Sequence, residues 1–401
     1  MIPLADALEH VLVRVPAQPT VEVPLAEAHG CVAADDVVSR ETIPAWDNTA
    51  LDGYAVHAAD VGVPGAVLDV VTTIAAGSAG EDPVGTGQAA RIMTGAPMPP
   101  GADTVVMVER TEALDDGRRV RVDAAVAEGT GVRRVGDDVR AGDVVVAAGT
   151  GLRAGHLGLL ASVGAVSVRV RRPVRVGVLS TGDELVEGGA PLRRGQIRDS
   201  NRLALLALGR SSGFEMVDLG LVPDDEEAIE AAIRAGCADA DALLTSGGVS
   251  MGDFDHVKVV LGRIAEMRWM QIAIKPAKPF AFGLLDGVPV FGLPGNPVSS
   301  LVSFELLARP ALRRAAGHVD IHRRRVRAVS EEGLRRRPDG KTHFVRVALS
   351  QDDRLGFRVR SAGGQGSHQM TALAAADGLA VLPDGDGVAA GADVEVILLD
   401  S

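Results

Sequence analysis

The sequence of 401 residues is poor in aromatic side chains and contains only two cysteines. Trp, Tyr and Phe make up 3% of the chain, so its cores must be built from aliphatic side chains. Cys31 and Cys237 lie far apart and lack the spacing of metal ligands, which argues against a disulfide framework or a structural zinc site. This cysteine usage fits a reducing cytoplasm.

The sequence also lacks a signal-peptide pattern, a long apolar run and an excess of basic charge. No apolar run is long enough to span a bilayer, so we expect a cytoplasmic protein without a membrane segment. The 41 Lys and Arg residues are outnumbered by 53 Asp and Glu residues, which gives a net charge of −12. Because general nucleic-acid binders usually present a basic surface, we do not expect nucleic acid as a partner.

The length predicts about three hydrophobic cores, and a hydrophobic content of 46% is ample to fill them. The pattern of predicted elements indicates a multidomain fold that combines α/β and β-rich parts. Its predicted parts are an N-terminal mixed α/β domain over 1–45 and 137–172, an inserted β-rich domain over 46–136, a central α/β domain over 173–318, and a small C-terminal β-barrel domain over 319–401.

The segment 173–318 is predicted to be a doubly wound α/β domain, because strands and helices alternate along it. We expect strands at 174–179, 215–219 and 241–245, and helices at 200–208, 223–234 and 257–264, with Ser200 as the N-cap of the first helix. In such sheets ligands bind at the carboxyl ends of the strands, near the switch in strand order. Two polar loops, 180–184 and 246–255, fall at such ends, which favours a ligand pocket there.

The loop that begins with Ser246-Gly247-Gly248 has no β-carbon at two successive positions. Backbone N–H groups can crowd around an anion in such a turn, and Ser250 adds a second hydroxyl. Asp255 follows shortly after, and carboxylates near a phosphate usually hold a hydrated Mg²⁺. A nucleotide or phosphorylated ligand is one interpretation, and an ordinary strand-to-helix loop with capping acids is the other.

Lys275 and Lys278 each precede a proline, which holds the backbone extended. Two cations in a rigid segment of an acidic protein can bind an oxyanion, although a solvated sheet edge guarded by prolines is the alternative. Asn296 and Pro297 suit the start of a helix that opens toward the same anion. Arg346 lies between two valines of a predicted strand and is a further candidate cation.

Six ordered motifs together resemble the molybdopterin molybdenumtransferases, whose animal relative is the gephyrin E domain. They are Asp-Asn-Thr-Ala-Leu-Asp-Gly-Tyr-Ala (47–55), Arg-Ile-Met-Thr-Gly-Ala-Pro (91–97), Ser-Thr-Gly-Asp-Glu-Leu (180–185), Thr-Ser-Gly-Gly-Val-Ser-Met-Gly (245–252), Lys-Pro-Ala-Lys-Pro (275–279) and Leu-Pro-Gly-Asn-Pro-Val-Ser (293–299). The resemblance covers nearly the whole chain. Each motif alone is weak evidence, and their common order makes the resemblance specific.

The resemblance implies the last step of molybdenum cofactor synthesis, in which molybdate enters adenylylated molybdopterin and AMP is released with the help of Mg²⁺. It also implies an elongated homodimer whose active site lies between the central domain of one subunit and the β-rich domain of the other. The molybdopterin adenylyltransferase and recipient molybdoenzymes would be further partners.

The resemblance also assigns roles to individual residues. Those expected to bind the pterin, its phosphates or the pocket around them are Ser246, Gly247, Gly248, Ser250, Gly252, Pro294, Asn296, Pro297 and Ser367. Glu184, Asp224 and Asp255 would bracket Mg²⁺, and Asp52, Thr94 and Asp138 would approach from the partner subunit. Lys275, Lys278 and Arg346 would attract the molybdate dianion.

Some positions depart from the family pattern or have an alternative role. Gln271 stands where some relatives have Lys, and Ala277 where Gly would be unsurprising. Asp224 could also serve only as the N-cap of its helix. Asp52-Gly53 and Thr94-Gly95, taken alone, fit ordinary turns.

Two other functions stay open for the chain as a whole: adenylylation of molybdopterin, which related α/β folds perform, and a non-catalytic scaffold as in gephyrin.

Overall fold

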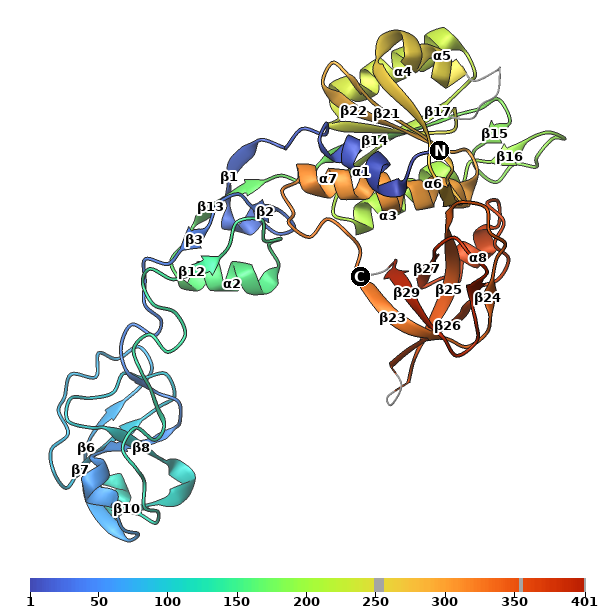
Figure 1. Ribbon diagram of the computed structural model, residues 1–401. Helices are drawn as coiled ribbons and strands as arrows, with labels where there is room; N and C mark the ends of the chain where they lie inside the picture. Colours follow the sequence, from blue (N-terminus) through green and yellow to red (C-terminus); the bar gives the residue numbers. More distant parts are fainter. Residues whose placement is uncertain (249–255, 353–355, 400–401) are drawn as a thin grey trace.

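The structure is a computed structural model and describes residues 1–248, 256–352 and 356–399. The chain forms an elongated, bent molecule (Figure 1). A β-rich part occupies one end, a small α/β part follows, and the larger α/β part lies beside the C-terminal β part at the other end. None of the described helices is long and apolar enough to cross a bilayer.

The central α/β part contains a six-stranded sheet in the order β17-β14-β18-β22-β21-β19. The first four strands are parallel, and the last two run antiparallel to their neighbours. The bounds are β14 (Arg175–Thr181), β17 (Glu215–Val222), β18 (Ala242–Ser246), β19 (Glu266–Gln271), β21 (Pro279–Leu285) and β22 (Val288–Leu293).

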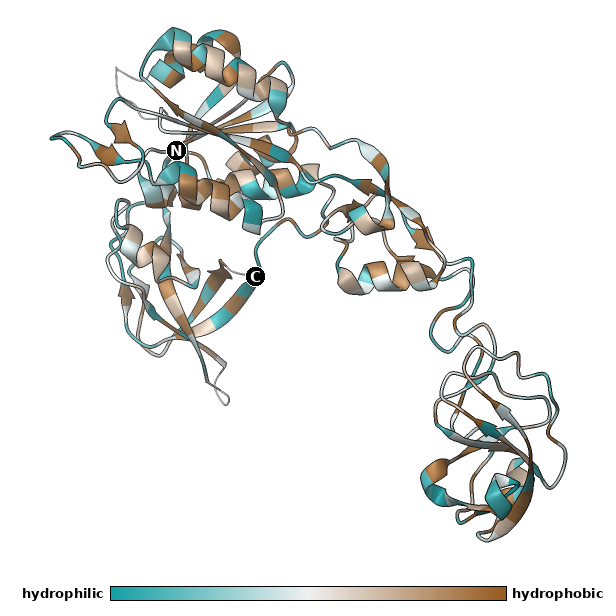
Figure 2. Cartoon of the chain, turned by 180° about the vertical axis from the view of Figure 1, so that it is seen from behind, coloured by the Kyte–Doolittle hydropathy of each residue, from teal (hydrophilic) through white to brown (hydrophobic). Residues whose placement is uncertain are grey.

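Helices cover both faces of this sheet, which confirms the doubly wound arrangement. Leu243 and Leu244 are successive residues of β18 and are buried in different cores, one on each face. On one side lie α4 (Glu226–Asp239) and α5 (His256–Ile264), and on the other α1 (Leu4–Leu12), α3 (Asn201–Ser211), α6 (Pro297–Ser303) and α7 (Arg309–Ala315). Apolar and polar residues share the surface of these helices, as expected for helices with one face on a core (Figure 2).

The first helix, α1, packs against the core of the central α/β part. Its residues Ala7 and Val11 are fully buried there, and Ile2 forms a bridge with Ile272 beside β19. Segment 1–45 therefore supplies a helix to the central part and strands to the small α/β part. The domain boundaries given above remain predictions.

The β-rich part is inserted into the small α/β part. That small part holds β1 (Thr20–Pro24), β2 (Val32–Ala33), α2 (Ala154–Ser162) and β13 (Ser167–Arg171). The chain leaves it after β3 (Val37–Val38) and returns through β12 (Val144–Val146), which pairs with β3. Between them lies a sheet in the order β8-β5-β7-β6-β10-β9, with β5 (Gly53–Val56), β6 (Ala66–Ile74), β7 (Gln88–Ile92), β8 (Thr104–Met107), β9 (Thr111–Leu114) and β10 (Arg119–Val122).

The C-terminal part is a closed five-stranded barrel, as predicted. Strand β25 pairs with both β26 and β27, which joins the two ends of the sheet. The barrel strands are β23 (Arg325–Ser330), β25 (Thr342–Asp352), β26 (Gly356–Ser361), β27 (Gly378–Leu382) and β29 (Asp393–Leu398). A short strand of the central part, β20 (Ile274–Lys275), runs parallel to β25 and ties the two parts together.

Candidate functional site

A cavity of about 490 Å³ opens at the carboxyl ends of β14, β18 and β22. The chain enters the sheet at β14 and then forms β17 on one side of it and β18 on the other, so the strand order switches between β14 and β18. Doubly wound sheets bind their ligands at this switch. Thr181 is the last residue of β14 and Ser246 is the last residue of β18, and both line the cavity.

The turn after β18 has the conformation that its glycines predict. Gly247 and Gly248 have φ values of 100° and 74°, a region that side chains other than glycine rarely adopt. A β-carbon at Gly248 would also lie 2.3 Å from Cβ of Val257, so this position tolerates no side chain without movement. Ser246 is buried and lines the cavity together with Gly247. Three expected site residues, Ser250, Gly252 and Asp255, lie outside the described residues.

The second wall of the cavity is the loop between β22 and α6. Asn296 occupies the N-cap position of α6 and Pro297 follows as its first residue, as predicted. The Asn296 side chain makes no capping hydrogen bond, which leaves its amide available to a ligand. Next to it, the Val298 amide donates to the Ser367 carbonyl at 3.0 Å and joins this loop to the barrel.

Two residues that sequence reasoning missed, Asp199 and Asn201, connect the strand ends. Nδ2 of Asn201 donates to Oγ of Ser246 at 2.8 Å and to the Gly295 carbonyl at 2.7 Å. Oδ1 of Asp199 accepts from Oγ of Ser180 at 3.2 Å, where β14 nears its end. The sequence signal at these positions is a short polar run, which by itself predicts only a helix cap.

The helix cap at α3 also differs from expectation. Ser200 stands at the N-cap position, but its side chain makes no capping hydrogen bond. Oδ1 of Asp199 accepts from the Arg202 amide at 3.2 Å instead. The position of the cap was predicted correctly, and the residue that provides the acceptor was not.

The acidic residues are divided between the cavity and its surroundings. Glu184 lines the cavity. Asp224 and Asp183 exchange hydrogen bonds, each carboxylate accepting from the backbone amide of the other residue at 3.1 and 3.4 Å. The N-cap of α4 is Asp225, which accepts from the Ala228 amide at 2.8 Å, so the interpretation of Asp224 as the cap is wrong.

The carboxylates near the cavity fit Mg²⁺ only in a site where water and substrate phosphates supply most of the ligands. Across 1–248, 256–352 and 356–399, no three His, Cys, Asp or Glu side chains group as a metal site would require. Mg²⁺ keeps several water ligands and commonly needs one or two protein carboxylates together with substrate phosphates. Glu184 at the cavity wall satisfies that smaller requirement.

The predicted cations lie apart from the Ser246 cavity. Lys275 lines a second cavity of about 510 Å³, formed with the barrel by residues that include Arg335, Arg337 and Gln365. Lys278 is exposed, and between the two lysines Ala277 has a φ of 75°.

Arg346 is fully buried beneath the loop that separates the two cavities. Its Nη2 donates to the carbonyl oxygens of Gly364 and Gly366 at 2.8 and 3.2 Å. Its Nε and Nη1 are buried without a partner among the described residues, and burial lowers the pKa of the guanidinium. In the same loop, Gln365 lines the second cavity and His368 the first.

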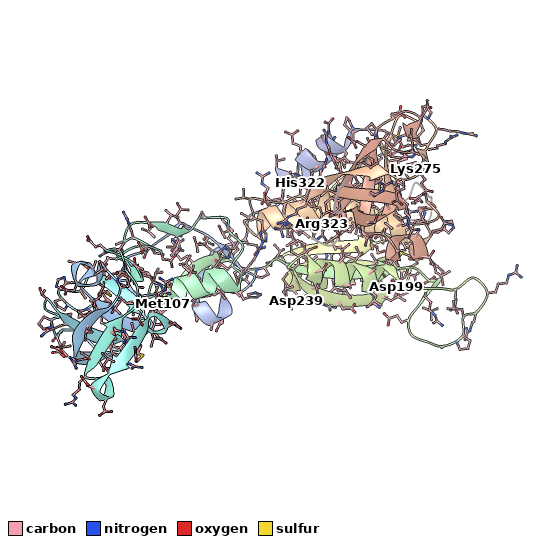
Figure 3. All side chains as sticks on the ribbon, turned by 90° about the horizontal axis from the view of Figure 1, so that it is seen from below. Met107, Asp199, Asp239, Lys275, His322 and Arg323 are labelled. Carbon is pink, nitrogen blue, oxygen red and sulfur yellow. The ribbon has the colours of Figure 1, made fainter. Side chains whose placement is uncertain are left out.

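The β-rich part brings Asp52 and Thr94 together, far from both cavities. Oδ1 of Asp52 accepts from the amide of Thr94 at 2.6 Å and from its hydroxyl at 2.8 Å, and these bonds lower the pKa of the carboxyl. Met107, which pairs with Gly53 next to Asp52, lies at the opposite end of the molecule from Asp199 (Figure 3). Asp138 is exposed in the segment that returns toward β12.

Comparison with known proteins assigns the chain to a family. Family models match it at residues 2–164 (MoeA N-terminal region, domain I and II), 177–314 (probable molybdopterin binding domain) and 328–399 (MoeA C-terminal region, domain IV). The molybdopterin molybdenumtransferase of Haemophilus influenzae is 38% identical over 99% of this chain and 98% of its own. The chain belongs to this family.

Other members agree in sequence and in fold. Molybdopterin molybdenumtransferase 2 of Mycobacterium tuberculosis is 40% identical over 94% of each chain. The crystal structure of a molybdopterin biosynthesis MoeA protein from Pyrococcus horikoshii OT3 superposes with a TM-score of 0.82 at 28% identity, and the match covers 99% of this chain and 100% of that one. The resemblance and the fold class expected from the sequence are confirmed.

The structure also places the two departures from the family motifs. Ala277 adopts a left-handed conformation, which explains why Gly would be unsurprising at this position. Gln271 is half-buried at the end of β19, pairs with Pro279 of β21 and lines neither cavity.

Proposed function

We propose that this chain inserts molybdate into adenylylated molybdopterin and releases AMP, the last step of molybdenum cofactor synthesis. The observation that carries the proposal is the Ser246-Gly247-Gly248 turn, which borders a cavity of about 490 Å³ at the strand-order switch. A cavity of this size suits an organic ligand of nucleotide dimensions. Membership of the transferase family supports the choice of reaction.

The substrate would lie between the two loops at the strand ends. The hydroxyl and amide groups of these loops are neutral hydrogen-bond donors, and such donors can bind the negatively charged phosphate oxygens. The residues proposed for the pterin and its phosphates are Ser246, Gly247, Gly248, Ser250, Gly252, Pro294, Asn296, Pro297 and Ser367.

Molybdate must approach a substrate that already carries negative charge. A dianion about 5 Å from one phosphate charge is repelled by about 7 kcal/mol at an effective dielectric constant of about 20. Lys275, Lys278 and Arg346, which lie apart from the Ser246 cavity, are proposed to attract the molybdate dianion and to offset part of its charge. Two nitrogen atoms of Arg346, Nε and Nη1, are buried without an acceptor among the described residues. An anion that accepts from them would remove the cost of leaving these donors unpaired, which supports the proposal.

Mg²⁺ is proposed to be held by Glu184, Asp224 and Asp255 together with substrate phosphates. When bound, it would supply positive charge that neutralises the phosphate oxygens from which AMP departs. Carboxylates at this position would otherwise repel the substrate, which is why we assign them to a metal.

A homodimer is proposed because one subunit alone leaves two groups of site residues apart. Asp52 and Thr94 form a hydrogen-bonded pair in the β-rich part, and the cavity lies in the central part at the other end of the molecule (Figure 3). We propose that this pair, together with Asp138, completes the cavity of the partner subunit. The molybdopterin adenylyltransferase and recipient molybdoenzymes remain proposed partners, and the cytoplasmic location remains a prediction.

The proposal is tested by supplying the purified chain with adenylylated molybdopterin, molybdate and Mg²⁺ in the absence of ATP. AMP release together with cofactor that activates a molybdenum-free recipient enzyme is the expected result. Activity only with ATP and bare molybdopterin would identify the adenylylation step instead. No turnover of either substrate would favour the scaffold function.

A further inference from the structure

Asn201 holds together the two loops that form the cavity walls. Its side-chain amide donates one hydrogen bond to Ser246 in the turn after β18 and another to the carbonyl of Gly295 in the turn after β22. The residue is 8% exposed, so water competes little for these bonds. Asn201 itself is the first residue of α3 and also lines the cavity.

The chemistry of the two partners fixes the orientation of this amide. The Gly295 carbonyl can only accept, so Nδ2 and not Oδ1 must face it. Oγ of Ser246 then accepts from the same Nδ2, which leaves the Ser246 hydroxyl hydrogen free to be donated elsewhere. No acceptor for it is found in the described part of the chain, so a ligand oxygen can take that place.

One backbone donor of the turn is already used. The Gly247 amide donates to the Leu293 carbonyl at 3.0 Å, at the end of β22. The Ser246 hydroxyl is therefore one of the donors, beside the Gly248 amide, that this turn can still offer to an anion. Because Asn201 sets which way that hydroxyl can donate, it acts on the ligand through Ser246.

Asp199 extends the same connection to a third strand end. Its carboxylate accepts from Ser180 of β14 at 3.2 Å and from Nε of Arg202 at 3.0 Å. The segment 199–201 thus touches the carboxyl ends of β14, β18 and β22, which are neighbours in the sheet.

We infer that Asn201 is a positioning residue, which directs the Ser246 hydroxyl toward a phosphate of the substrate and fixes the distance between the two walls. The inference rests on the proposed function for the identity of that phosphate. It assigns to Asn201 an effect on substrate binding, without contact with the reacting atoms.

The test compares Asn201→Ala, Ser246→Ala and the double variant by calorimetric binding of AMP and by KM and kcat. We expect each single variant to weaken AMP binding and raise KM by about tenfold, as the loss of a buried hydrogen bond does, while kcat changes by less than about threefold. Since both residues act on one hydroxyl, the double variant should resemble the single variants, within about threefold. Leu203→Ala, at a 70% exposed position of the same helix, is the control and should match the unaltered chain.

Multiplied effects in the double variant, of about a hundredfold, would overturn the inference, as would a fall in kcat with KM unchanged. Asn201→Asp keeps the side-chain size and serves if Asn201→Ala does not fold. It removes the donor and should weaken AMP binding at least as much, and unchanged binding would also overturn the inference. An unaltered chain that binds AMP but releases none from the adenylylated substrate refutes the proposed function only. One that binds no AMP refutes both.

Discussion

Replacing Arg346 with methionine separates stability from ligand binding. The guanidinium is fully buried, has two carbonyl partners and keeps two N–H groups unpaired. Its two hydrogen bonds contribute about 1.5–3 kcal/mol each, and burial of the charge costs several kcal/mol, so these terms nearly cancel. We therefore expect Arg346→Met to change the stability of the ligand-free protein by less than about 2 kcal/mol.

Arg336 lines the same cavity as Lys275 and offers a control for stability only. Its side chain is also buried, but it forms ion pairs with Asp339 and Asp384 at 2.8 and 2.7 Å and donates to the Lys341 carbonyl. Arg336→Met leaves these acceptors without their partner, and a loss of at least about 3 kcal/mol is expected. The corresponding unfolding midpoint should fall by roughly 6 °C or more, against less than about 4 °C for Arg346→Met.

The effect of molybdate on stability tests the assignment of Arg346 to the anion. Molybdate at about 100 times its dissociation constant stabilises a binding protein by about 2.7 kcal/mol. Calorimetric scans with and without molybdate should show this gain in the unaltered chain and lose most of it in Arg346→Met. A large loss of stability in ligand-free Arg346→Met, together with an intact response to molybdate, would refute the assignment of Arg346 to the anion.

Three further outcomes are expected. Gly248→Ala should abolish AMP binding and should lower the unfolding midpoint more than Gly213→Ala does. Both positions have a positive φ, but only at Gly248 would the new β-carbon collide with a neighbouring side chain. Equal effects of the two variants in melting and binding experiments would contradict this. Mixing inactive Asp52→Ala and Gly248→Ala chains should restore part of the AMP release, because a shared dimer contains one intact site, and no recovery after subunit exchange would argue against sharing. Burial lowers the pKa of His318 to about 4, so its contribution to stability is fully present above pH 6.5 and is lost as the pH falls toward 4. A His318→Gln chain whose unfolding midpoints show the same dependence on acid pH would exclude this contribution.

The features that sequence could predict are those set by local backbone chemistry or periodicity. The turn at Ser246-Gly247-Gly248 has the positive φ values that its glycines indicate, and alternation of strands and helices gave the doubly wound sheet. Asn296 stands at the N-cap position and Pro297 begins the helix, as their residue types predict. The turn and the helix start depend on neighbours within a few residues, and the alternation of elements is a pattern that the sequence itself displays.

The features that sequence could not predict depend on contacts between distant segments. Asn201 binds partners 45 and 94 residues away, so nothing in its own neighbourhood revealed the connection. Lys275 lines a cavity of the barrel because β20 pairs with β25, a contact that follows from tertiary structure alone. Asp225 and Asp224 are equally good caps by type, and only the hydrogen bond to Ala228 distinguishes them.

Crystals of the chain exposed to AMP and to molybdate test the central claim most directly. We expect the AMP phosphate beside Ser246 and Asn296 in the cavity at the strand-order switch, and molybdate within reach of Lys275, Lys278 or Arg346. Both ligands bound elsewhere, or neither bound at saturating concentration, would contradict the proposed function.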